Sequence, residues 1–221
     1  MSAITLSDEV LDLRLACVWL EQIQVGESGS EVSRWCRAIV DEAVAKGPPQ
    51  ERFDAVRRLL RAGGYRPAGR NKPAQEYLWR TVQSDGQLPR ILDLVDVINA
   101  VSLSSGLPIS LLATRATGPG LRVRYGRAGE SFVFNRAGQT LDLEGLLVCA
   151  STDDQPLGTP VKDSMEGKLQ TGDSAALAIV YAPCSQVSVD DLASIADHLC
   201  DGFQLAQPQA IITTTSASTS P

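Results

Sequence analysis

The sequence has 221 residues, a net charge of −6 and 43% hydrophobic residues, which predicts one large domain with a real core that folds alone. Its longest apolar runs, such as 175–183, are far too short to cross a bilayer, and Asp8 and Glu9 stand where a signal peptide carries basic residues. We therefore expect a cytoplasmic protein that does not engage a membrane.

The first third of the chain is predicted to be helical or mixed. The dense apolar run 13–20 fits a buried strand and a helix equally well. Residues 30–47 predict a helix with Ser30 as N-cap and a Gly-Pro-Pro stop after it. Further helices are expected at 52–62 and at 74–84, the latter with Pro73 in its first turn.

The second half of the chain predicts mainly strands. After a helical pattern at 94–104, short apolar or alternating runs separated by glycines fill 121–151, which is typical of antiparallel strands joined by tight turns. A central strand is expected at 175–183, then a helix capped by Ser188 and a last short strand at 209–214. The domain division is 1–70 for an N-terminal helical or mixed part, 71–210 for the core and 211–221 for a low-complexity tail to which we assign no structure beyond that strand.

The stretch 52–90 is basic although the whole chain is acidic. It holds nine basic and three acidic residues, a local excess of six positive charges. One interpretation is a basic face that contacts phosphate, which needs a local patch and not a basic average. The other is a solvated helix face, with arginines opposite an apolar stripe in residues 52–62.

Polar residues interrupt the apolar helix at 94–104. A buried asparagine needs hydrogen bonds, so Asn99 either pins nearby backbone or faces a polar ligand. Asp96 is expected to partner Asn99 or to cap a loop, and this is favoured over a catalytic role. Gly106 is expected to end the helix in a left-handed conformation, followed by Pro108, which cannot continue it.

A second polar group stands just before the strand at 175–183. Within 162–168 the chain carries five hydrogen-bonding side chains: Lys162, Asp163, Ser164, Glu166 and Lys168. A loop of this kind on a rigid scaffold could orient an ester, a phosphate or a water. A solvated charged turn is the alternative interpretation.

The usual catalytic and metal signatures are absent from the sequence. The five cysteines are scattered, odd in number and never in CxxC spacing, so neither a disulfide framework nor a zinc site is indicated. His198 is the single histidine, in an expected peripheral helix, which argues against a Ser-His-Asp triad. No phosphate-binding GxxxxGK[ST], HExxH or GxSxG motif occurs. We expect no metal and no cofactor.

Three ordered blocks of the sequence carry a family resemblance. The segments "NKPAQEYLWR…LPRILDLVDVINAVSLSSGLPIS", "VKDSMEGKLQT" and "LAIVYAP" resemble the editing module of the phenylalanyl-tRNA synthetase beta subunit, the B3/B4 tRNA-binding domain. The likeness runs from about Asn71 to Pro183 and is greater to free-standing proteins built from that module alone. It implies an α+β fold of layered, sandwich-like antiparallel or mixed sheets with flanking helices.

The resemblance also implies an activity and a set of site residues. In the synthetase, the cleft accepts the 3′ end of a mischarged tRNA and hydrolyses its ester. Asn99 matches the asparagine of the family pattern "VVDVTNYVM", where Ile98 replaces a threonine, and Ser110 stands at the position of a family histidine. Glu166 lies five residues before Thr171, the spacing of a glutamate that recognises the tyrosine hydroxyl in some synthetases.

The resulting hypothesis is a tRNA-binding, editing-like module that hydrolyses mischarged aminoacyl-tRNA in trans. A water positioned by Ser164 or Ser110 could suffice because the ester is already activated, with Lys162 stabilising developing negative charge. The expected residues are, as catalytic, Asn99, Lys162 and Ser164; as substrate-binding, Ile98, Ser110 and Glu166; and as tRNA-binding, Arg66, Arg70, Lys72, Arg80 and Arg90. The alternative hypothesis is a non-catalytic module that binds tRNA, a free amino acid or a protein. The oligomeric state is left open.

Overall fold

Two four-stranded sheets and one short hairpin make up the strands of the computed structural model, which describes residues 3–118 and 120–219. The central sheet has the order β10 (Ile211–Ser218), β2 (Leu13–Glu21), β9 (Ala175–Pro183) and β3 (Ile109–Ala113). The outer sheet has the order β1 (Ala3–Leu6), β4 (Gly120–Tyr125), β7 (Leu147–Ser151) and β8 (Pro156–Gly158). The hairpin pairs β5 (Ser131–Val133) with β6 (Thr140–Asp142).

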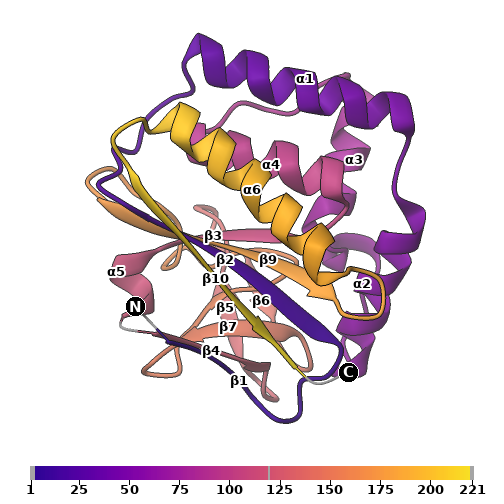
Figure 1. The fold of residues 1–221 in the computed structure, drawn as a ribbon. Helices are drawn as coiled ribbons and strands as arrows, with labels where there is room; N and C mark the ends of the chain where they lie inside the picture. Colours follow the sequence, from indigo (N-terminus) through magenta and orange to yellow (C-terminus); the bar gives the residue numbers. More distant parts are fainter. Residues whose placement is uncertain (1–2, 119, 220–221) are drawn as a thin grey trace.

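Helices cover one face of the central sheet, and the outer sheet lies on the other side (Figure 1). The helical segments are α1 (Ser30–Lys46), α2 (Gln50–Ala62), the 3-10 turn η1 (Gly69–Asn71), α3 (Ala74–Asp85), α4 (Asp93–Ser105), the short α5 (Thr114–Thr117) and α6 (Val189–Ala206). Strand pairs are antiparallel in the central sheet, whereas β1 pairs with β4 in parallel. The layered α+β architecture of antiparallel and mixed sheets is confirmed.

The strands β2, β9 and β3 of the central sheet are buried on both faces, which explains their dense apolar runs. In β9, Ala178 and Val180 pack toward the helices, while Ile179 packs toward the outer sheet. A strand covered on both sides needs apolar residues at every position, not at every second one. The run 13–20, which fits a helix and a strand equally well by sequence, therefore forms strand β2.

Helix ends follow the chemistry of their flanking residues. The Ser188 hydroxyl accepts a hydrogen bond from the backbone N–H of Asp191 at 3.0 Å and caps α6 as predicted. Helix α4 ends as predicted at Gly106, with φ 70°. The N-cap of α1 is Gly29 and not Ser30, which is the first helical residue, so that prediction was wrong by one position. No helix in the described ranges is long and apolar enough to span a membrane.

The C-terminal segment is a correction to the sequence analysis. The strand expected at 209–214 is present, but it begins at Ile211 and continues to Ser218, four residues farther into the segment expected to be a low-complexity tail. This eight-residue strand β10 pairs with all but the first residue of β2. The indole N–H of Trp19 in β2 donates to the Thr215 hydroxyl at 3.2 Å. Threonine is a favourable strand residue, and an edge strand tolerates polar side chains on both of its faces, so polar composition did not prevent pairing. Residues 220–221 lie outside the described part of the chain.

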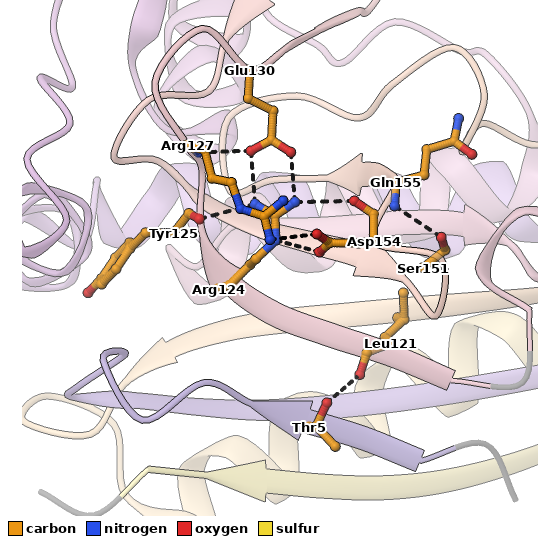
Figure 2. Close-up of polar contacts among 9 residues, drawn as sticks. All are labelled: Thr5, Leu121, Arg124, Tyr125, Arg127, Glu130, Ser151, Asp154 and Gln155. Carbon is orange, nitrogen blue, oxygen red and sulfur yellow. Dashed lines mark hydrogen bonds and ion pairs between the residues drawn. The ribbon is translucent and has the colours of Figure 1, made fainter.

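A buried arginine joins two turns at the outer sheet (Figure 2). Arg124 of β4 is 3% exposed and donates two hydrogen bonds of 2.8 and 2.7 Å to the Glu130 carboxylate. It also donates to the Asp154 carboxylate at 2.8 Å and to the Asp154 carbonyl at 3.2 Å. These contacts lower the pKa of both carboxyl groups. Removing one partner of such a buried pair is strongly destabilising because it leaves a charge uncompensated. The network therefore ties the turn after β4 to the turn after β7.

Candidate functional site

The charged segment picked out by the sequence forms a loop at residues 159–168, between β8 and β9. At its start, the Thr159 hydroxyl donates to the carbonyl of Lys162 at 2.8 Å and accepts from the N–H of the same residue at 3.0 Å. At its end, the Ser164 hydroxyl accepts from the N–H of Gly167 at 2.9 Å. Short-range bonds of this kind from Ser and Thr to the backbone hold a loop in one conformation.

The 159–168 loop is also tied to elements distant in the sequence. Ala113 of β3 donates its N–H to the carbonyl of Gly167 at 2.8 Å. Ala74, the first residue of α3, donates to the carbonyl of Pro160 at 2.9 Å. These bonds bring the loop against the end of the central sheet and against the helix that follows the basic stretch.

Ser110 of β3 lies at the centre of a group of polar side chains beneath this loop, which we call the Ser110 cluster (Ser110, Cys149, Asp163 and Tyr181). The Ser110 hydroxyl donates to the Asp163 carboxylate at 2.6 Å and is 3.0 Å from the Tyr181 hydroxyl. Tyr181 is in turn 3.1 Å from the Cys149 sulfur. The second Asp163 oxygen accepts from the N–H of Leu111 at 3.2 Å. The chain of contacts runs from the core between the sheets to the half-buried Asp163.

The Ser110 cluster holds one carboxylate among groups that stay protonated. Burial raises the pKa of Cys149 to about 12, and it raises the pKa of Tyr181 well above its ordinary value. Burial also raises the pKa of Asp163 to about 6, opposed by its bonds from Ser110 and Leu111. Asp163 is therefore the member of the cluster that changes charge near neutral pH.

Basic side chains gather on the outer side of the loop, in what we call the cationic group (Arg70, Lys162 and Lys168). The Lys162 ammonium lies 3.7 Å from the centroid of the Phe134 ring, within the range of a cation–π contact. The Lys168 ammonium donates to the Phe134 carbonyl. The pKa of Lys162 is lowered mainly by burial and further by the nearby positive charges of Arg70 and Lys168. Arg70 and Lys168 are exposed, so this group presents positive charge to solvent.

Ser164 and Glu166, also predicted as site residues on this loop, differ in their exposure to solvent. Ser164 is 2% exposed, so its hydroxyl lies beneath the loop surface. Glu166 is exposed, and its carbonyl accepts from the Arg115 guanidinium at 3.0 Å. With Ser110 and Lys162, the structure thus brings four of the six predicted catalytic and substrate-binding residues to one region.

The structure does not bring Ile98 and Asn99 to the Ser110 cluster. Both lie on α4, which packs on the helix-covered face of the central sheet, and Ile98 is a member of that core. Ser110 points to the opposite face, toward Tyr181. Asn99 is half-buried and makes no side-chain hydrogen bond within the described ranges. Its expected partner Asp96 instead caps a loop, accepting from the Ile91 N–H at 2.8 Å and the Ser28 hydroxyl at 2.6 Å.

The five residues predicted to bind tRNA separate into distinct positions. Arg70 belongs to the cationic group, and Arg70 and Arg80 both lie near the Tyr77 hydroxyl, whose pKa they lower against a larger rise from burial. The backbone of Lys72 contacts the same hydroxyl. Two members lie elsewhere: Arg66 lines a cavity of about 320 Å³ with Asp142 and Glu144, and Arg90 donates to the carbonyl of Ser28.

Tyr181 and Asp163 were not assigned a role from the sequence. Tyr181 is hidden in the apolar run of β9, which predicts only a buried strand. Asp163 is one of five polar side chains that the sequence does not rank. A tyrosine inside an otherwise aliphatic strand is a usable signal, because a buried phenol needs a hydrogen-bond partner. Among the described residues, no group of three or more His, Cys, Asp or Glu side chains could hold a metal ion.

Comparison with known proteins supports the resemblance seen in the sequence. Residues 61–183, more than half of the chain, match the family model of the B3/4 domain. The fold is similar to a solved structure, the N-terminal fragment of the phenylalanyl-tRNA synthetase beta subunit from Pyrococcus horikoshii, with a TM-score of 0.51 and 8% identity. That match covers 99% of this chain and 55% of the other, so this chain spans about half the length of its structural relative. No curated protein matches the sequence significantly. The chain belongs to the B3/4 domain family.

Proposed function

We propose that this protein binds the acceptor end of a tRNA over the 159–168 loop and removes a wrongly attached amino acid from it. The observation that carries the proposal is the meeting of Arg70, Lys162 and Lys168 beside Phe134, which come from three separate parts of the chain. Lysine and arginine bind phosphates, and aromatic rings stack with unpaired bases. A single-stranded, charged RNA end fits both features, although the whole chain is acidic.

Hydrolysis of the ester would use a bound water, with different roles for the predicted residues. Lys162 is half-buried with its ammonium over the Phe134 ring, and it is the one cation among the predicted catalytic residues, so it would stabilise the negative charge that develops on the carbonyl oxygen. Ser164 would act as a positioning residue, because its hydroxyl holds the loop through Gly167. Glu166, exposed on the same loop, would bind the amino group of the amino acid. Asn99 would contribute from the other side of the sheet only by supporting α4.

A non-catalytic binding module is the second candidate, and one observation favours it. The Ser110 hydroxyl is 1% exposed and is engaged by Asp163 and Tyr181, while Ser164 is 2% exposed. Neither hydroxyl faces solvent, so water at the loop surface would be positioned by Lys162 and backbone groups. A module of this kind would bind the aminoacylated end of an RNA without hydrolysing its ester.

Deacylation of a panel of mischarged aminoacyl-tRNAs separates the two candidates. We expect release of at least one amino acid above the buffer rate, and a slower rate for Lys162→Ala. Lys46→Ala is the matched control, because Lys46 is an exposed lysine on α1 that pairs with Glu42 at 2.6 Å. Binding without release in any member of the panel would leave the non-catalytic module.

Salt dependence of tRNA binding tests the phosphate contacts themselves. Binding should weaken steeply as salt rises, and the double variant Lys162→Ala, Lys168→Ala should reduce the slope of log affinity against log salt by about 1.4 to 1.8, the value for two lost phosphate contacts. A slope that is the same in the double variant and in Lys46→Ala would place RNA binding elsewhere or remove it.

A further inference from the structure

A cavity of about 450 Å³ opens between α1 and the segment that joins α3 to α4. One wall is the face of α1 that carries Ser30, Arg34 and Arg37, and the facing wall is residues 87–90. The volume is within the range of sites that hold small organic molecules. No part of the proposed tRNA interaction uses this space.

The lining of the cavity combines exposed arginines with apolar side chains. The basic rim consists of Arg34, Arg37 and Arg90, and the apolar lining includes Val40, Leu88 and Pro89. Since arginine forks match the oxygens of carboxylate and phosphate groups, the rim selects an anion, while the apolar lining selects an apolar body.

The arginines of the rim are only partly neutralised by the protein. Arg34 is exposed and has no ion-pair partner within the described ranges, and Arg90 donates to a backbone carbonyl, that of Ser28. Arg37 pairs with Asp41 at 3.0 Å on the exposed surface. Asp96 also lines the cavity and adds one negative charge, because its hydrogen-bond donors, the Ser28 hydroxyl and the Ile91 N–H, are neutral. Three arginines against the carboxylates of Asp41 and Asp96 leave one net positive charge for a ligand to neutralise.

We propose that this cavity is a binding site for a small organic anion, a carboxylate or a phosphate ester with an apolar body. The anionic group lies between Arg34 and Arg90, and the apolar body packs on Val40 and Leu88. The site is separate from the 159–168 loop, because α1 and α4 lie on the helix-covered face of the central sheet. The cavity shares no lining residue with the cationic group, so its proposal can be tested whether or not the protein binds or hydrolyses aminoacyl-tRNA.

The proposal is tested by titrating the full chain with four small probe ligands of similar size and recording the NMR shifts of the backbone amides at each step. The probes are 3-phenylpropionate, phenyl phosphate, 3-phenylpropan-1-ol and 3-phenylpropan-1-amine. We expect saturable shifts with the two anions, confined to residues 30–40 and 87–96, and at least tenfold weaker binding of the alcohol and the amine. The relative strength of the two anions decides whether the site prefers a carboxylate or a phosphate.

Variants assign the anion contact to the rim. Arg34→Gln should weaken binding of the preferred anion at least tenfold, because it removes a positive charge that faces the anionic group. The fold should be unaffected, since Arg34 makes no described bond. Arg58→Gln is the control, because Arg58 is an exposed arginine on the neighbouring helix α2 and does not line the cavity. Equal affinity for anion and alcohol, unchanged affinity in Arg34→Gln, shifts centred elsewhere, or no saturation by about 10 mM would each overturn the proposal.

Discussion

Asp163 is a half-buried carboxylate whose surroundings act on its charge in opposite directions. The Ser110 hydroxyl and the Leu111 N–H stabilise its ionised form, but burial outweighs them and the pKa rises from 3.8 to about 6. An acid with a raised pKa binds its proton more tightly in the folded state than in the unfolded state. Folding is therefore favoured at low pH by this group, and that contribution is lost as pH rises from 3.8 to about 6.

Replacing Asp163 by Asn should flatten this pH dependence. The wild-type free energy of unfolding should carry a downward component between pH 3.8 and about 6 that D163N lacks. Urea unfolding across this pH range measures the slope for both proteins. Asp153→Asn is the control, because Asp153 is an exposed carboxylate on a nearby turn. Parallel slopes in wild type and D163N would show that Asp163 titrates as it does in the unfolded chain.

The roles of single residues were predictable only where their partners are near in sequence. Asp96 was expected to cap a loop or to pair with Asn99, and one of its two partners, Ile91, is five residues away. The other, Ser28, is 68 residues away, and nothing in the local sequence indicates it. Ser110 and Asp163 are 53 positions apart, and no local pattern links a serine in an apolar strand to one aspartate among several. Ile98, expected to bind substrate by alignment, packs in the core instead, because the helix face it occupies covers the central sheet.

At the scale of single elements, two helices end at a glycine in the same left-handed conformation, but the two glycines have different surroundings. Gly86 ends α3 with φ 73°, and a Cβ atom there would meet nothing within 4 Å. Gly106 ends α4 with φ 70°, and a Cβ atom there would lie 2.4 Å from Cγ of Pro49. The backbone strain of an added side chain is therefore similar, while steric overlap occurs at one position alone.

Alanine at each position should separate strain from overlap. Gly86→Ala is expected to cost about 1 kcal/mol of unfolding free energy, the cost of a left-handed non-glycine residue. Gly106→Ala should cost about 1 to 3 kcal/mol more, because the proline ring at the start of α2 must move. Chemical denaturation of the two variants side by side gives the difference. Equal losses would mean that Pro49 moves aside without cost.

Elements with strong end signals were predictable, and short ones were not. Ser188, two acidic residues behind it and an apolar face define α6 from local sequence alone. The strands β1 and β8 have four and three residues, too few to show a period, and they exist because a neighbouring strand offers hydrogen bonds. Strand β10 was missed beyond residue 214 because its Thr and Ser residues match the composition of a disordered tail.

At the scale of the whole molecule, β10 closes one edge of the central sheet. Its eight residues pair with β2 in antiparallel register, from Ile211 opposite Glu21 to Ser218 opposite Arg14. Thr219 extends this attachment through three hydrogen bonds with the backbone of Leu13, at 2.9, 3.0 and 3.1 Å. Without β10, the nine-residue strand β2 would become the edge of the sheet, and its backbone groups would lose their partners.

Deleting residues 211–221 should destabilise the protein without abolishing the fold. We expect a loss of roughly 3 kcal/mol, because several backbone hydrogen bonds are lost while the exposed side chains of β10 contribute little burial. The exposed edge of β2 should also promote self-association. Urea unfolding and light scattering measure the two effects. A chain lacking residues 220–221 alone is the control, and identical unfolding of both truncations would contradict the prediction.

The layered architecture followed from the sequence, but the relation between its layers did not. The three blocks of family resemblance predicted the fold class, and the short apolar runs separated by glycines predicted the strands. Whether Asn99 and Ser110 share a face depends on the turn at Gly106 and on which side of β3 the serine points. A single residue of register reverses that side, so local sequence does not decide it.

The contact between Trp19 and Thr215 gives the molecule an optical reporter at the edge of its central sheet. The other two tryptophans, Trp35 and Trp79, lie among the helices, where Trp79 donates its indole N–H to the carbonyl of Leu103. Detachment of β10 would expose the indole of Trp19 to water and shift its fluorescence to longer wavelength, while the helical indoles kept their emission. The emission wavelength of tryptophan fluorescence thus distinguishes detachment of the C-terminal strand from unfolding of the helical layer.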